Sequence, residues 1–218
     1  MRRRTIGKAA RFKIYARCRP LFRAERLKGG KIMATKIFVD AGHGGSNPGA
    51  VGNGVIEERV NLSVATQLAQ NLRNAGYEVM EYRTTRDENV LDNVAQDLRN
   101  RARMANEWGA DYFVSIHTNS SLNPAANGFE TYVYRIPSRA AELAQSIQDA
   151  FVSELGSKDN GVRSANFSVL RNTNMPAVLC ELGYLSNPTE ALNLNSPLWQ
   201  TKAARAIFNG IYNFVKPY

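Results

Sequence analysis

From Lys36 to the C-terminus, short runs of β-branched and aromatic residues alternate with longer segments of helical periodicity. The run 37–39 is entirely apolar, and five apolar residues also stand in succession at 176–180, as in strands that are buried on both faces. In 57–75, by contrast, apolar residues recur at the three- and four-residue spacing of an amphipathic helix. Strand and helix in this order predict a single α/β domain, in which helices cover both faces of a mostly parallel sheet.

The same pattern places the individual elements. We expect strands at 37–39, 77–80, 112–116, 128–134, 167–170 and 177–182, and helices at 57–75, at 91–108 and from 138 onward. Two further helices are expected after Asn187-Pro188 and Ser196-Pro197, because each pair combines an N-cap residue with a proline at the first helical position.

The formal net charge of +9 is distributed very unevenly along the chain. Residues 1–32 hold twelve Lys or Arg and one acid, whereas residues 33–218 hold sixteen Lys or Arg and eighteen acids. A nucleic-acid-binding domain carries its cationic surface within the fold, so we expect no nucleic acid as a partner of the main part of the chain. We also expect no transmembrane segment, because no apolar run approaches the length of about 18–20 residues that a membrane-spanning helix needs.

The chain contains only two histidines, and each directly follows an expected strand. His43 lies in the sequence DAGHGG, and His117 lies in SIHTN. In parallel α/β sheets, ligands bind outside the carboxyl ends of the strands, so two imidazoles in these positions can face one another. The alternative is that each histidine is simply a polar loop residue.

Carboxylates are expected at the same edge of the sheet. Glu57 and Glu58 open the first helix, and Glu181 directly follows the apolar run that ends at Cys180. An acid in a first helical turn often only interacts with the helix dipole. A carboxylate after five apolar residues is costly to bury unpaired, and an ion pair with an arginine is its structural alternative. Asp40 is a candidate for orienting an imidazole, although a turn role at the strand end is the favoured interpretation.

Two imidazoles and one carboxylate form a known ligand set of catalytic zinc, with the fourth position open to water. Zinc lowers the pKa of its water to about 7, and a second carboxylate can accept the proton. Spacing alone leaves open whether Glu57 or Glu58 takes part and which carboxylate binds the metal. Phosphate-binding and serine-hydrolase sites fit less well, because neither Gly-Lys-Ser/Thr nor Gly-x-Ser-x-Gly occurs in the chain.

Several segments, in order from about residue 36 to the C-terminus, match one known family. They are 37–50 (IFVDAGHGGSNPGA), 57–62 (EERVNL), 101–106 (RARMAN), 109–119 (GADYFVSIHTN) and 161–188 (GVRSANFSVLRNTNMPAVLCELGYLSNP). The chain resembles the zinc-dependent N-acetylmuramoyl-L-alanine amidases of bacterial and phage cell-wall lysis. This resemblance implies a single three-layer αβα domain around a largely parallel sheet.

The resemblance also implies roles for individual residues. By matching position, His43, Glu57 and His117 bind one Zn²⁺ per chain, and Glu181 is the catalytic glutamate. The family often has Glu-Lys where this chain has two glutamates, and the distance to Leu62 favours the first of the two. The implied reaction is hydrolysis of the amide between N-acetylmuramic acid and the L-alanine of the peptidoglycan stem peptide. Another peptidoglycan metallo-endopeptidase is the alternative enzyme, and a non-catalytic wall-binding module is the alternative from a different class.

We divide the chain into a basic extension, 1–32, and a catalytic domain, 33–218. The extension is expected to be disordered, because its charge and lack of apolar periodicity leave too little surface to bury. The peptide 28–33 (KGGKIM) is what a purine-rich ribosome-binding sequence and a start codon would encode. We therefore predict that Met33 is the true start and that the extension is a translated leader. The alternative is a cationic arm that holds the enzyme on anionic wall polymers, an attraction that salt weakens.

The expected place of action is the bacterial cell wall. Arginines interrupt every apolar stretch near the N-terminus, so we expect no ordinary signal peptide. The protein would then be made in the cytoplasm and reach the wall through lysis or a phage holin. Sequence leaves the oligomeric state open, as well as the choice between an autolysin and a phage endolysin.

Overall fold

A six-stranded sheet in the order β4-β1-β5-β8-β6-β7 runs through the described part of the chain, residues 34–217 of a computed structural model. The strands are β1 (Lys36–Ala41), β4 (Glu78–Glu81), β5 (Tyr112–Asn119), β6 (Phe129–Val133), β7 (Asp159–Ser164) and β8 (Ala177–Tyr184). A separate hairpin consists of β2 (Val51–Gly52) and β3 (Val55–Ile56). The predictions that concern residues 1–32 lie outside the described residues.

Four neighbouring strands, β4, β1, β5 and β8, run parallel to one another. β6 runs antiparallel to β8, and β7 runs parallel to β6. The reversal follows from the connection before β6, because residues 120–128 contain no helix and are too few for a parallel crossover. The expected mostly parallel sheet is confirmed, with one antiparallel junction between β8 and β6.

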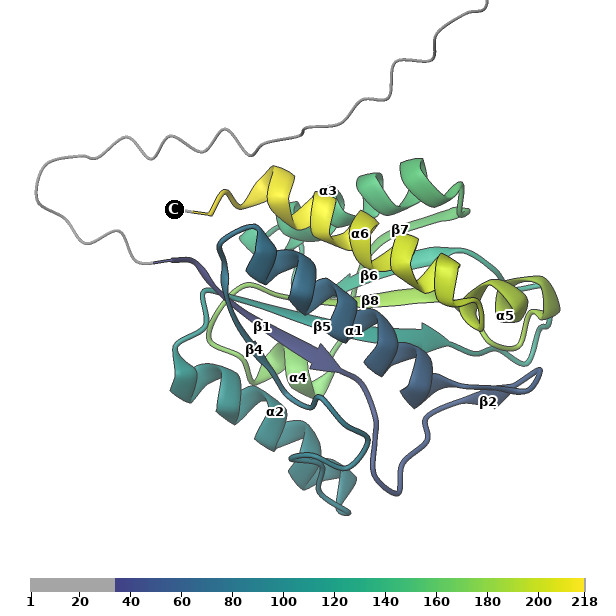
Figure 1. Cartoon of the computed structure of the whole chain (residues 1–218), viewed down its shortest axis with the longest axis horizontal. Helices are drawn as coiled ribbons and strands as arrows, with labels where there is room; N and C mark the ends of the chain where they lie inside the picture. The colour runs from purple at the N-terminus through teal and green to yellow at the C-terminus, as the bar shows by residue number, and fades with distance from the viewer. Residues whose placement is uncertain (1–33, 218) are drawn as a thin grey trace, which may run out of the picture. The chain divides into compact units, whose positions relative to one another are not determined.

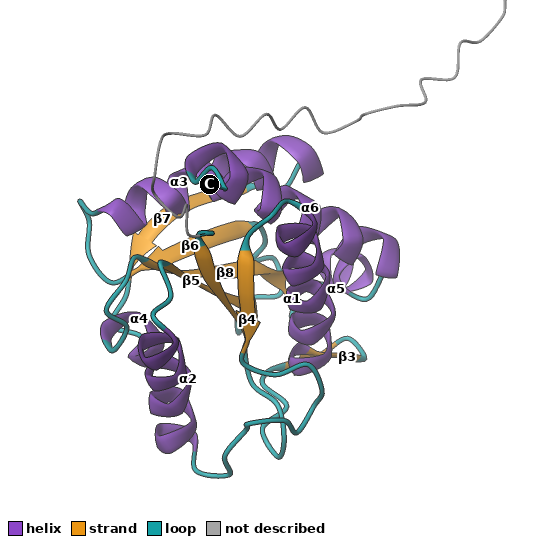
Figure 2. Ribbon diagram, turned by 60° about the vertical axis from the view of Figure 1, so that its left-hand side comes forward, coloured by secondary structure: helices purple, strands orange, loops and turns teal. Residues whose placement is uncertain are grey.

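Helices cover both faces of the sheet (Figures 1 and 2). One face carries α1 (Glu57–Asn74), α3 (Arg139–Leu155), α5 (Pro188–Leu194) and α6 (Pro197–Phe214), and the other carries α2 (Val94–Trp108) and α4 (Ser168–Arg171). The three-layer αβα class expected from the sequence is therefore confirmed. None of the helices in the described residues is long and apolar enough to cross a membrane.

Four of the helices in the described residues begin at a residue whose side chain caps them. The side chain of Asn187 accepts hydrogen bonds from the first turn of α5, and Ser196 accepts one from Trp199 N in α6. Both N-cap predictions are confirmed. Asn93 and Ser138 cap α2 and α3 in the same way, by satisfying backbone N–H groups that lack a partner inside the helix.

The two faces of the sheet have cores of different size. Ile37 and Val39 of β1 point into a large apolar core shared with α1, α3 and α6. Phe38 points to the other face, where it stacks on Phe113 with ring centroids 5.6 Å apart and joins a smaller apolar core beneath α2 and α4. The smaller core leaves room at the carboxyl edge of the sheet for polar side chains.

One expected strand is wrong, and the strands β2, β3 and β7 were not expected. The run 167–170, expected to be a strand, lies at the start of the short helix α4. Its buried residues, Val169 and Leu170, are adjacent and do not alternate as they would in a half-buried strand, and such short apolar runs are ambiguous. β7, which was not expected, is largely polar and partly exposed, so it lacks the apolar signal of the inner strands.

Candidate active site

Four predicted site residues come from four elements that meet at the carboxyl edge of the parallel strands. His43 lies in the loop after β1, and Glu57 is the first residue of α1. His117 and Glu181 lie within β5 and β8, which continue beyond the ends expected from the sequence. The pairing of β5 with β8 is irregular just after His117, and such irregularities often re-aim side chains next to active sites.

The two imidazoles converge on one carboxylate oxygen. Glu57 Oε1 lies 3.2 Å from His43 Nε2 and 3.0 Å from His117 Nδ1. The imidazole rings themselves are 5.0 Å apart and nearly perpendicular. Burial alone would raise the pKa of Glu57, but its hydrogen bonds with His117 and His43 outweigh this effect and hold the pKa well below its usual range.

Backbone groups hold the Glu57 carboxylate in place. Ala50 N donates to Oε2 at 2.8 Å, and Thr118 N donates to Oε1 at 3.1 Å. Asn61, one helical turn further along α1, donates to Oε1 at 3.3 Å. The side chain is only 4% exposed, so these donors fix its position with little competition from water.

Two glycines allow the backbone to approach these side chains closely. A Cβ atom at Gly42 would lie 2.3 Å from the His117 ring. A Cβ atom at Gly49 would lie 2.6 Å from Glu57 Oε2, and its positive φ of 69° also favours glycine. The glycine-rich sequence around His43 therefore makes space for the cluster.

The structure distinguishes between the two adjacent glutamates. Within the described residues, the group that could hold a metal ion consists of His43, Glu57 and His117, whose ligand atoms all lie within 4.8 Å of one another. Glu58 points elsewhere, and its Oε1 lies 3.5 Å from Arg86 Nε. Of the two adjacent glutamates, the first therefore lies in the cluster, and its role as a metal ligand stays a prediction.

The donor set fits a zinc ion. Zinc–ligand distances of about 2.0–2.1 Å in a tetrahedral shell place neighbouring ligand atoms roughly 3.3 Å apart. The separations of 3.2 Å and 3.0 Å between Glu57 Oε1 and the histidine nitrogens are close to this value. His43 Nδ1 lies 3.2 Å from Asn47 Oδ1, so that its Nε2 is the nitrogen turned toward the cluster.

Glu181 lies beside this cluster, because it is paired in register with His117 on the neighbouring strand. Its Oε2 atom is shielded from solvent and has no hydrogen-bond partner within residues 34–217. Burial raises the pKa of the Glu181 carboxyl well above its usual range, and the charges of Glu57 and Glu130 raise it further. A free oxygen and a raised pKa suit a carboxylate that accepts and returns a proton.

Glu130 is a neighbour of this site that the sequence did not single out. On β6 it is paired with Glu181, and it is 1% exposed. The hydroxyls of Tyr132 and Tyr184 both donate to its carboxylate. The only sequence signal was an acid inside an expected strand, which did not by itself distinguish a buried position from an exposed one.

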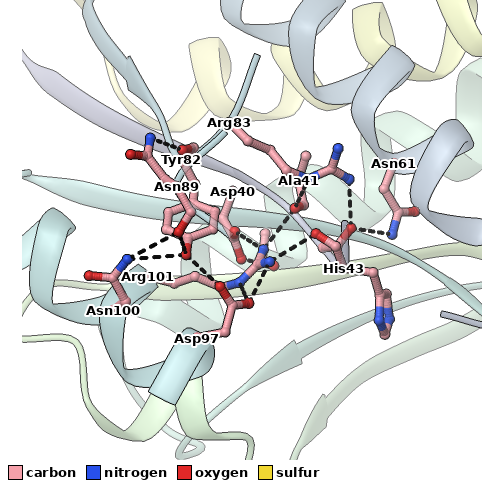
Figure 3. Close-up of polar contacts among 12 residues, drawn as sticks. Asp40, Ala41, His43, Asn61, Tyr82, Arg83, Asn89, Asp97, Asn100 and Arg101 are labelled. Atoms are coloured by element: carbon pink, nitrogen blue, oxygen red, sulfur yellow. Dashed lines mark hydrogen bonds and ion pairs between the residues drawn. The ribbon is translucent and has the colours of Figure 1, made fainter. Parts of the chain in front are cut away.

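Asp40 does not contact an imidazole in the structure. It is fully buried within β1, where Oδ1 accepts from Arg101 Nη1 at 2.7 Å and Oδ2 accepts from the Ser115 hydroxyl at 2.6 Å. Neither the turn role nor direct orientation of a histidine describes it. Figure 3 shows Asp40 within a polar network that includes Arg101 and Asp97.

Fold and site together define a class. An αβα domain with two imidazoles and a carboxylate at the carboxyl ends of its strands, beside a second carboxylate with a free oxygen, has the composition of a metallohydrolase. The sequence model of the family described as N-acetylmuramoyl-L-alanine amidase matches residues 37–213. The chain belongs to this family of hydrolases, as the resemblance of its motifs predicted.

Individual relatives agree with this assignment. The chain is 39% identical over 185 residues to the uncharacterized protein YqiI of Bacillus subtilis, covering 84% of this chain and 86% of YqiI. It is 38% identical over 179 residues to the sporulation-specific N-acetylmuramoyl-L-alanine amidase of Bacillus subtilis, covering 81% of this chain but only 66% of that protein.

A solved structure also resembles the domain. The catalytic domain of CwlV, an N-acetylmuramoyl-L-alanine amidase from Bacillus (Paenibacillus) polymyxa, superposes with a TM-score of 0.74 at 38% identity. The match covers 83% of this chain and 97% of the CwlV domain.

Proposed function

We propose that this domain hydrolyses the amide bond between N-acetylmuramic acid and L-alanine in peptidoglycan, with one zinc ion per chain held by His43, Glu57 and His117. The observation that carries the proposal is the convergence of both imidazoles on Glu57 Oε1, beside the free Oε2 atom of Glu181. The amidase family supplies the substrate class.

A zinc ion bound at this cluster would supply a Lewis acid that polarises the amide carbonyl and acidifies water. The Glu181 carboxylate takes the proton from the attacking water, and a raised pKa makes it a stronger base. When the carbon–nitrogen bond breaks, the same carboxyl group returns the proton to the leaving amine of L-alanine. The proton is thus conserved over the cycle, and Glu181 ends as it began.

The other residues of the site keep this geometry. Asn61 and the N–H group of Thr118 hold Glu57 by its Oε1 atom. Asn47 holds His43 by its Nδ1 atom. Two of the three proposed ligands, Glu57 and His43, are thereby oriented by a further group, the arrangement that usually accompanies a metal site.

Digestion of purified peptidoglycan tests the reaction. The protein, with zinc added, should release new N-terminal L-alanine and no new reducing sugar ends. New amines at other residues would indicate an endopeptidase, and new reducing ends would indicate a glycosidase. No product, together with retention of the protein on the polymer, would indicate a wall-binding module and overturn the proposal.

The proposed place of action is the bacterial cell wall, where peptidoglycan is found. Producing the protein inside bacterial cells, with and without permeabilisation of the membrane, separates access to the wall from activity on it. Lysis of cells whose membrane is not permeabilised would contradict a requirement for a holin.

A further inference from the structure

We infer that Arg83 and Arg101 position the metal-ligand loop by binding the carbonyl groups of Ala41, Gly42 and His43. We call these two guanidinium groups and three carbonyls the carbonyl clamp. The inference rests on the proposed zinc site and assigns to the buried arginines a role that the reaction itself does not. They are positioning residues, since neither lies in the cluster that could hold the metal.

The two guanidinium groups together bind every carbonyl from Ala41 to His43. Arg101 donates from Nη1 to Ala41 O and from Nη2 to His43 O, both at 2.8 Å. Arg83 donates from Nε to Ala41 O at 3.0 Å and from Nη2 to Gly42 O at 2.9 Å. Both arginines are 1% exposed, so water does not compete for these bonds.

Anchoring the His43 carbonyl also holds the backbone from which its imidazole projects. His43 has a φ of 60°, a left-handed conformation that residues other than glycine seldom adopt without support. In Figure 3 the ring points away from the polar network while the carbonyl points toward Arg101. A rotation of the His43 backbone would move the carbonyl and the base of the side chain together, so the hydrogen bond from Arg101 opposes that movement of the proposed metal ligand.

Arg83 connects two of the segments that carry metal ligands. The same Nη2 atom that donates to Gly42 O also donates to Glu58 O at 3.0 Å. Gly42 precedes His43, and Glu58 follows Glu57. The Arg83 side chain therefore sets the distance between the β1 loop and the start of α1.

Arg101 is itself held rigidly by charged and aromatic neighbours. Its Nε atom donates to Asp97 at 2.8 Å, and its Nη1 atom donates to Asp40 at 2.7 Å. The guanidinium carbon lies 4.3 Å from the centroid of the Tyr82 ring. A planar guanidinium can satisfy two carboxylates and two carbonyls at once, which the single ammonium of a lysine cannot do.

The alternative is that both arginines serve only to fill and neutralise a buried pocket. On that view their replacement lowers the stability of the metal-free protein but leaves the zinc affinity of the folded protein unchanged. If they position the loop, the folded protein must lose zinc affinity. The two roles therefore differ in a property that is independent of catalytic activity.

The test is zinc affinity of the full-length metal-free protein, measured by competition with a chromogenic chelator. Arg101→Lys and Arg83→Lys should each bind zinc about 10–100-fold more weakly, the range typical for groups that orient metal ligands. Thermal unfolding of the metal-free variants, monitored by circular dichroism, establishes the folded fraction. Arg103→Lys is the matched control, because this exposed arginine on the same helix pairs only with α2 residues.

Ser115→Ala is a milder variant in case the lysine variants do not fold. It removes only the hydrogen bond from the Ser115 hydroxyl to Asp40. It should weaken zinc binding less than the two lysine variants do. Unchanged zinc affinity in folded variants, with lower melting temperatures, would overturn the clamp. Failure of the unchanged protein to bind zinc would instead overturn the proposed metal site, on which the clamp depends.

Discussion

The two faces of the central sheet are built from different side chains. On the face of α1, α3 and α6, most buried residues are apolar, as Leu68, Phe151 and Ile207 illustrate. On the face of α2, the apolar core is smaller, and toward the carboxyl edge it is replaced by charged residues such as Asp40 and Arg101.

The apolar face therefore mainly stabilises the fold, and the polar face mainly positions the groups of the site. Apolar burial contributes stabilisation in proportion to area, without requiring exact geometry. Buried ion pairs contribute little net stability because desolvation offsets their attraction, but they fix the positions of the groups they bind. Changes on the apolar face should therefore alter the free energy of unfolding, whereas changes on the polar face should alter metal binding and rate.

The largest expected effect is the loss of the metal ligands on the polar face. His43→Ala and His117→Ala should each remove bound zinc and reduce the release of L-alanine to background, because each deletes one of three proposed ligands. Metal content by mass spectrometry and the peptidoglycan digest check this together. Asn123→Ala, in an exposed loop, is the control. Stoichiometric zinc in the double histidine variant would show that the ligand assignment is wrong.

Replacing the proposed base should affect rate without affecting metal. Glu181→Gln should lower kcat by about 10²–10⁴-fold, the usual contribution of general acid–base catalysis, because the amide keeps the shape but accepts no proton. Zinc content should stay at one per chain. Glu142→Gln, at an exposed position of α3, should change neither quantity. Loss of zinc from the Glu181 variant would make this residue a ligand and would reverse the proposed roles.

Shortening a large buried side chain on the apolar face should lower stability without affecting rate or metal binding. Phe151 is fully buried and stacks on Phe129 with ring centroids 3.7 Å apart. Phe151→Ala should lower the free energy of unfolding by about 3–5 kcal/mol, as measured by urea denaturation. Zinc affinity and kcat of the folded fraction should be unchanged. Leu192→Ala is the matched surface control, since this leucine is 76% exposed.

The sequence predicted the part of this comparison that depends on local pattern. Buried strands such as 37–39 can be predicted from their apolar runs. Because each histidine follows a strand, any parallel sheet brings His43 and His117 to the same edge. Five matching segments, among them 109–119 and 161–188, then identified the family. Fold class and the candidate ligands could therefore be predicted without coordinates.

What the sequence did not predict depends on contacts between distant residues. Arg101 and Asp40 are far apart in the chain, and an arginine on a helix is ordinarily a solvent-exposed residue, so nothing local indicated that this one is buried. Glu130 was missed for the same reason. The place of β6 beside β8 also depends on which edge of β8 is free, which local periodicity does not determine.

A smaller effect is expected on the pH dependence of stability, through Glu181 on the polar face. In the metal-free protein, the raised pKa of Glu181 means that the unfolded chain loses this proton at a lower pH than the folded one. The Glu181 carboxyl therefore lowers the free energy of unfolding as pH rises above its unfolded pKa of about 4.3. Below that pH it has no such effect. Metal-free Glu181→Gln should be more stable than the unchanged protein at pH 7 by about 1–3 kcal/mol.

The difference in unfolding free energy should shrink as pH falls toward 4, because the carboxyl is then protonated in both states. Urea denaturation of both proteins between pH 4 and pH 8 checks the sign. A variant that is less stable at pH 7, or a difference independent of pH, would show that Glu181 carries no such cost in the folded state.

The smallest expected effect compares one helix cap from each face. Ser138 caps α3 by accepting from Ala141 N at 3.1 Å, and Asn93 caps α2 by accepting from Gln96 N at 3.0 Å. Replacing either by Ala should lower the free energy of unfolding by about 1 kcal/mol. Only Asn93→Ala should also weaken zinc binding, because α2 carries Arg101, one of the two arginines of the carbonyl clamp. Equal zinc affinity in the two cap variants would show that loosening the first turn of α2 does not reach the metal-ligand loop.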